Sequence, residues 1–252
     1  MYRFTKQPPE QKLISIGRAA QLLGISIATL RRWDDSAQLP SIRSGPRGHR
    51  FYKLSDVEQF TQDQASLAKK WVESSQGVEP EDDVYCKTRD VFQARLESLQ
   101  SKLSQGLPLG TVSLIAAVAG EIGNNSFDHN LGNWPDIMGT FFASSLRSKV
   151  VVLADRGQGI LTTLKRVRPK LSNAQEALKV AFTETVSGRP SEARGNGLKF
   201  VRQVVVNNHL TLYFQTGDAY LCLKNGDHEI IVKQAGNPIG GCLAIIGFGG
   251  GR

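Results

Sequence analysis

The residues best suited to chemistry begin with Glu121 and Asn125, which stand four positions apart in a helical pattern. Side chains at this spacing on a helix project side by side. A carboxylate beside an amide oxygen suits magnesium–phosphate chemistry: the Asn125 carbonyl can ligate a hard cation, and Glu121 can accept a proton from a water or hydroxyl. On this helix alone, a solvated polar face is the simpler interpretation.

A second group of residues follows the apolar, β-branched run at 149–154, which is typical of a buried strand. At the end of that run stand Asp155, Gly157 and Gly159. A carboxylate at a strand end can accept the exocyclic amine of adenine, and glycines beside it let the ring approach the backbone. This pattern favours an adenine subsite.

A third group is the turn containing Gly195, Gly197 and Leu198, which opens a helical pattern. Free backbone N–H groups at the start of that helix would face phosphate oxygens. One such turn is weak evidence, because plain turns often contain two glycines. The order of the three groups, ExxxN, DxGxG and GxGLxxV, is far more specific and indicates a nucleotide site.

This ordered set resembles the GHKL ATPases, which include gyrase, histidine kinases, mismatch-repair ATPases and the anti-sigma serine kinases. The resemblance covers residues 106–252 and implies ATP and Mg²⁺ as cofactors. It implies Glu121 as catalytic base, Asn125 as the magnesium ligand and Asp155 as the adenine contact. The glycines of the two turns, with Leu198, would surround the nucleotide.

The same resemblance implies a fold and a mobile element. The fold would be an α/β sandwich, a mixed sheet with helices on one face, and residues 161–194 would form an ATP lid. The last strand departs from the family, because Cys242 stands where a threonine usually supports the adenine contact. No histidine lies in the helical segment before this region, which argues against a histidine autokinase.

The N-terminal region has a different pattern, two short helices separated by a tight turn. Leu30 and Trp33 of the second helix can pack on the first, which gives a helix-turn-helix. The residues of the second helix outside the packed face are candidates for DNA contact: Ala28, Thr29, Arg31 and Arg32.

The loop at 41–52 is rich in glycine and arginine, and we interpret it as a β-hairpin wing. Its DNA-contact candidates are Arg43, Arg47, His49, Arg50 and Tyr52. Residues 13–60 together resemble the winged helix of MerR-type regulators, excisionases and some serine transposases. The resemblance implies that the second helix enters the major groove while Arg31, Arg32 and the wing hold phosphates.

These patterns divide the chain into three parts and predict an α+β protein. A small all-α winged helix-turn-helix at 1–62 is followed by a helical linker at 63–105, suited to dimerisation, and by the ATP-binding domain at 106–252. The net charge of +8 favours a polyanionic partner, which is double-stranded DNA in this interpretation. The sequence contains neither a signal peptide nor a long apolar run, and its three cysteines lie far apart, so we expect a cytoplasmic protein away from membranes.

The predicted function is that of a transcription regulator in which Mg–ATP modulates binding of DNA or of a protein partner. Two enzymatic alternatives remain open at this point. One is an anti-sigma-type serine/threonine kinase with an autoregulatory DNA-binding head, in which Glu121 activates a partner's hydroxyl. The other is a DNA-dependent, defence-type ATPase. A degenerate ATP-binding fold used only as a scaffold is a further alternative.

Overall fold

The computed structural model of the protein describes residues 12–23, 25–35, 37, 39–44, 48–185 and 197–249. The chain divides into two compact units, residues 1–63 and 64–252. In the part of the chain that the structure describes, no helix is long and apolar enough to span a membrane.

The first unit combines helices with a small antiparallel sheet. Its elements in chain order are β1 (Leu13–Ser15), α1 (Ile16–Leu23), α2 (Ile27–Asp35), β2 (Ile42–Ser44), β3 (His49–Lys53) and the beginning of α3 (Leu54–Glu73). Strand β3 lies between β1 and β2, with Ile14 opposite Tyr52 and Arg43 opposite Arg50. The prediction of an all-α domain was therefore wrong. In β1 only the middle residue, Ile14, is buried, which is the alternation of a strand.

The core of the first unit confirms the helix-turn-helix packing. Leu30 and Trp33 of α2 are buried, as the spacing predicts, and the Trp33 ring lies 4.6 Å from the ring of Phe60 on α3. Ala19, Ala20 and Leu23 of α1 belong to the same cluster: three apolar residues on one helical face.

The second unit is built on a five-stranded sheet in the order β4-β5-β6-β8-β7. The strands are β4 (Tyr85–Cys86), β5 (Thr140–Ser145), β6 (Val150–Asp155), β7 (Leu210–Lys224) and β8 (Val232–Phe248). Every pair of neighbours in this sheet is antiparallel, so the expectation of a mixed sheet was wrong. The long strand β7 is irregular around Gly217, where its register against β8 shifts.

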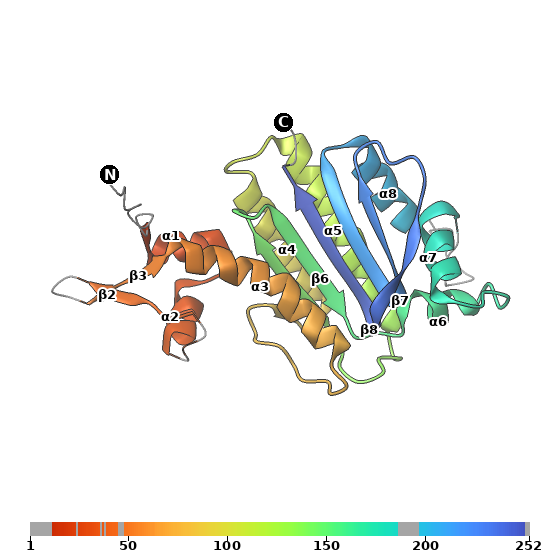
Figure 1. The fold of residues 1–252 in the computed structure, drawn as a ribbon, viewed down its shortest axis with the longest axis horizontal. Coiled ribbons are helices and arrows are strands. Elements are labelled where there is room, and N and C mark those ends of the chain that lie inside the picture. The colour runs from red at the N-terminus through yellow and green to blue at the C-terminus, as the bar shows by residue number, and fades with distance from the viewer. Residues whose placement is uncertain are drawn as a thin grey trace, which may run out of the picture. The chain divides into compact units, whose positions relative to one another are not determined.

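Helices cover both faces of this sheet, as Figure 1 shows. One face packs against α4 (Arg89–Leu103), α5 (Leu109–Asn130), α7 (Ala174–Thr183) and α8 (Gly197–Asn207). The other face carries Phe141, Val152 and Leu243, which pack with Ala68 and Val72 of α3. The expectation of helices on one face was therefore wrong, because the strands alternate apolar residues on both sides.

Residues 64–105, nearly all of the predicted helical linker at 63–105, contain the C-terminal part of α3, the short strand β4 and helix α4. They belong to the second unit, because β4 pairs with β5 and α4 packs along α5. Phe92 and Leu99 of α4 are buried in its main core. Dimerisation through this stretch stays a prediction.

Candidate functional site

Helix α5 places the first motif at one edge of a buried helix. Ile115, Val118 and Ile122 face the core. Glu121 and Asn125 lie side by side as predicted, and the Asn125 Nδ2 donates to Glu121 Oε1 at 3.3 Å. This bond leaves the Asn125 carbonyl oxygen, the atom suited to a cation, on the opposite side of the amide.

Asp155 ends β6 as a buried carboxylate, only 3% exposed. Its Oδ2 accepts a hydrogen bond from Ser126 Oγ at 2.7 Å, and its Oδ1 accepts one from the Gly157 backbone N–H at 2.8 Å. Burial raises the pKa of Asp155, whereas hydrogen bonding to the carboxylate acts in the opposite direction.

Two of the residues that hold this carboxylate site together were missed by sequence reasoning. Besides Ser126, the buried Asn130 accepts from the Gln158 backbone N–H at 2.8 Å and donates to the Ser126 carbonyl oxygen. Ser126 and Asn130 stand four residues apart on α5, which places them on one side of the helix. This spacing was the signal in the sequence that could have indicated a shared role.

Glycines bring the three motifs into close contact. A Cβ on Gly197, the first residue of α8, would lie 1.8 Å from Glu121 Oε1. A Cβ on Gly157 would lie 2.1 Å from Asn130 Nδ2. Helix α5 therefore contacts both the turn after β6, at Gly157, and the start of α8, at Gly197.

The remaining predicted nucleotide residues have different environments. Gly159 begins α6 (Gly159–Lys165) with a φ of +73°, a conformation that favours glycine. Leu198 packs against the main core of the second unit. Gly195 lies outside the described residues.

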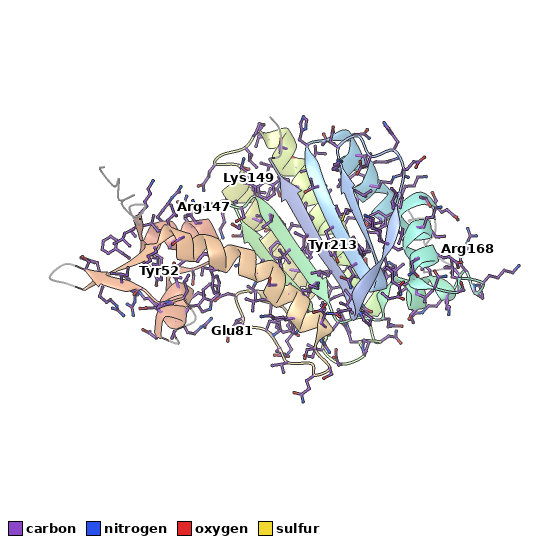
Figure 2. The ribbon with its side chains drawn as sticks, viewed as in Figure 1. Tyr52, Glu81, Arg147, Lys149, Arg168 and Tyr213 are labelled. Carbon is purple, nitrogen blue, oxygen red and sulfur yellow. The ribbon has the colours of Figure 1, made fainter. Side chains whose placement is uncertain are left out.

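Part of the predicted ATP lid at 161–194, helix α7, belongs to the core, and residues 186–194 lie outside the described residues. Leu178 and Phe182 on α7 are fully buried, and the Phe182 ring lies 5.3 Å from that of Phe214 on β7. The lid prediction was therefore wrong for α7, because this helix is amphipathic and packs on the sheet. Arg168, at the outer side of this segment in Figure 2, pairs with Glu184 at 2.9 Å.

In the first unit, α2 presents Ala28, Arg31 and Arg32 at the surface. Thr29 is buried and bonds to Ser26, the residue that caps this helix. Tyr52, labelled in Figure 2, is fully buried, and its hydroxyl donates to the Leu30 carbonyl oxygen at 3.2 Å. The structure therefore assigns Thr29 and Tyr52 to packing, in contrast to the predicted DNA contacts.

The wing is tied to the end of α2 by a group of ion pairs. Arg50 Nε donates to Asp34 Oδ2 at 2.6 Å, and its Nη2 donates to Asp35 Oδ1 at 2.9 Å. Arg43 also donates to Asp34 Oδ2, at 3.0 Å. His49 is exposed, and Arg47 lies outside the described residues. Arg43 and Arg50 thus orient the wing, a role that was not predicted from the sequence. The signal was the presence of two acidic residues at the C-terminus of a helix, where negative charge is unfavourable unless a basic side chain pairs with it.

Asp34 is the centre of this group. Burial raises its pKa, but hydrogen bonds from Arg50 and from the Ser41 backbone outweigh that effect, and the pKa falls from 3.8 to about 2. A carboxylate with a lowered pKa stabilises the fold above its ordinary pKa. That stabilisation disappears as the pH falls through about 2.

Replacing Asp34 with asparagine is therefore expected to destabilise the protein by about 1–2 kcal/mol at neutral pH, since charged hydrogen bonds are lost. Thermal unfolding of the full chain measures the effect at pH 7 and at steps between pH 4 and 2. The advantage of the wild type should shrink over that acid range. Asp35→Asn, whose side chain is 66% exposed, is the control and should change stability less. A difference between wild type and Asp34→Asn that is constant with pH would contradict the role of the charge.

Comparison with known proteins identifies the first unit. Residues 15–52 match the family described as "MerR family regulatory protein". The N-terminus carries a MerR-family helix-turn-helix. The matched residues include α1, α2, β2 and most of β3.

Two curated relatives are similar to parts of the chain. The "Transcriptional repressor DcmR" of Methylorubrum extorquens (strain DSM 6343 / CIP 106787 / DM4) is 36% identical over 75 residues, which cover 30% of this chain and 27% of that protein. The "Type II methyltransferase M.Eco47II" of Escherichia coli is 39% identical over 57 residues, which cover 23% of this chain and 14% of that protein. Each similarity thus covers less than a third of the relative's own length.

Proposed function

We propose that the second unit binds Mg–ATP and that its occupancy changes how the MerR-type N-terminus binds DNA. The observation that carries the proposal is the meeting of three motifs at one place. Glu121 of α5 touches the start of α8 at Gly197, and Asp155 is held beside them by Ser126 of the same helix. The order of these motifs resembles the GHKL ATPases.

The residues fit a nucleotide in two respects. First, glycines at 157, 197 and 241 let the segments around Asp155 and Glu121 pack closely together, which brings the proposed adenine and phosphate contacts near one another. Second, Ser126 and the Gly157 backbone N–H occupy two of the roughly four acceptor positions of the Asp155 carboxylate. Acceptor positions therefore remain for the amine of adenine.

Each polar residue would have a separate task when Mg–ATP is bound. Asp155 would select adenine, and Asn125 would add one oxygen ligand to a magnesium ion. Within the described residues no group of three or more acidic, histidine or cysteine side chains could hold a metal. Mg²⁺ binds readily through one protein ligand plus phosphates and waters, so this arrangement suits a metal that arrives with the nucleotide. Glu121 would accept a proton from the attacking group if the phosphate bond is cleaved.

The DNA half of the proposal rests on the surface of the first unit. Arg31 and Arg32 on α2 are exposed and can neutralise phosphates, while the helix enters the major groove. The name of the repressor that resembles this chain is consistent with gene regulation. A single short helix reads one half-site, so we expect a homodimer on DNA.

The proposal is tested by fluorescence anisotropy of the intact protein on a labelled duplex selected by the protein from a randomised pool. Asn125→Ala should bind DNA alike with and without Mg–ATP, because it lacks the proposed magnesium ligand. Asn124→Ala is the matched control, since this neighbouring amide faces α4 and accepts from Gln93 at 2.7 Å. It should respond to Mg–ATP as the wild type does. A wild type that binds no Mg–ATP in titration calorimetry would overturn the proposal.

A further inference from the structure

Arg156 stands between two residues of the candidate nucleotide site, Asp155 and Gly157, and its side chain is 9% exposed. Its Nε and Nη2 both donate to Asp136 Oδ2, at 2.8 and 2.5 Å. The turn that would contact the nucleotide therefore carries a buried guanidinium paired with Asp136.

The rest of this guanidinium holds the C-terminal end of helix α3. The Arg156 Nη1 donates to the carbonyl oxygens of Trp71 and of Ser74, the latter at 2.9 Å. The last carbonyls of a helix have no partner within the helix, and a cation there also interacts favourably with the helix dipole. The guanidinium carbon lies 5.9 Å from the centroid of the Trp71 ring. Arg156 is thus the C-terminal cap of α3.

Helix α3 is continuous in the chain from Leu54 to Glu73, and its two ends belong to different cores. Leu54 packs against the cluster of the first unit that contains the helix-turn-helix. Ala68 and Val72 pack on the sheet of the second unit. The helix capped by the nucleotide turn is therefore the one that begins in the DNA-reading unit.

We propose that Arg156 is a positioning residue that transmits occupancy of the nucleotide site to α3. A nucleotide that binds Asp155 and the Gly157 backbone reorients the peptide units on both sides of residue 156. A buried charge cannot leave its partners without a large desolvation cost, so the last turn of α3 follows Arg156. The inference rests on the proposed function and names its regulatory contact.

The test is Arg156→Lys, which keeps the charge but loses the fork that reaches Asp136 and two carbonyl oxygens together. Mg–ATP affinity by calorimetry, and DNA affinity without nucleotide, should each stay within about 3-fold of the wild type, since Arg156 touches neither ligand in the proposal. The change in DNA affinity at saturating Mg–ATP should fall below about 2-fold, against at least about 5-fold in the wild type. A purely structural role would leave that ratio unchanged.

Two further variants make the result decisive. Asp136→Asn removes the charged partner at a residue that is 34% exposed, so it tests the same contact if Arg156→Lys folds poorly. Arg168→Lys makes the same chemical change at an exposed arginine and should keep the wild-type ratio. A wild-type ratio in both Arg156→Lys and Asp136→Asn would overturn this inference alone. A wild type without any nucleotide effect on DNA binding would overturn the proposed function, and the inference with it.

Discussion

Replacing Asp155 with asparagine is expected to weaken Mg–ATP binding by roughly 10- to 100-fold, because a hydrogen bond to a charged group contributes about 1.5–3 kcal/mol. Asparagine has the same shape, and its amide nitrogen can face Ser126, whose hydroxyl accepts as readily as it donates. Its carbonyl oxygen can still accept from the Gly157 backbone. The fold should therefore survive, and removal of a buried charge should leave the melting temperature unchanged or raised.

Titration calorimetry with Mg–ATP and thermal unfolding measure the two halves of this prediction. Ser126→Ala is the matched control, because it removes one neutral donor and leaves the carboxylate in place. It should weaken binding by no more than about 10-fold. Equal Mg–ATP affinity in Asp155→Asn and the wild type would show that Asp155 does not contact the base.

Replacing Gly241 with alanine is expected to destabilise the second unit by about 3 kcal/mol, since it combines backbone strain with steric overlap. The added Cβ would lie 2.1 Å from the Asp155 carbonyl oxygen and 2.6 Å from the Gly157 nitrogen, both of which are backbone atoms. The φ of Gly241 is +74°, where side chains are disfavoured. For a unit of this size the loss corresponds to a fall of roughly 6–12 °C in melting temperature.

The neighbouring Gly240→Ala is the control for that measurement. A Cβ there would have no atom within 4 Å, and the residue is exposed on the same strand. Its melting temperature should differ from the wild type by no more than about 2 °C. Similar melting temperatures for the two variants would contradict the close packing of β8 against the nucleotide turn.

The parts of the site that sequence predicted are those set by local spacing. Glu121 and Asn125 are neighbours because a helix brings positions four apart together. Leu30 and Trp33, three positions apart on α2, lie on the same helical face for the same reason. The contact between Glu121 and Gly197 links residues 76 positions apart. Only the order of the motifs, with the family resemblance, made that contact predictable.

The missed features depend on tertiary contacts that no local pattern encodes. Arg156 occupies an unspecified position of DxGxG, and its partners, Asp136 and the end of α3, lie far away in the sequence. Tyr52 looked like a wing residue, yet the pairing of β3 with β1 turns it into the core. The lid at 161–194 was predicted from the family resemblance, whereas the apolar face of α7 packs on the sheet.

Sheet architecture was also only partly predictable. The apolar runs at 210–214 and 219–223, which lie on either side of Gly217, both belong to the single strand β7. A positive φ and a register shift at Gly217 let a single strand continue past the glycine. Glycine and other turn-forming residues occur both at bulges and at chain reversals. Here β8 pairs with β7 on both sides of Gly217, so the glycine lies at a bulge.

The proposed function claims that Mg–ATP changes the affinity of the chain for DNA. This requires two conformational states of the chain, which Mg–ATP binds with unequal affinity. The most direct measurement is the DNA affinity of the intact protein, by anisotropy on the selected duplex, with saturating Mg–ATP and without nucleotide. A change of at least about 5-fold is predicted, the lower end of ordinary allosteric coupling, together with its loss in Asn125→Ala. Equal DNA affinities under both conditions, while calorimetry shows that Mg–ATP is bound, would contradict the claim.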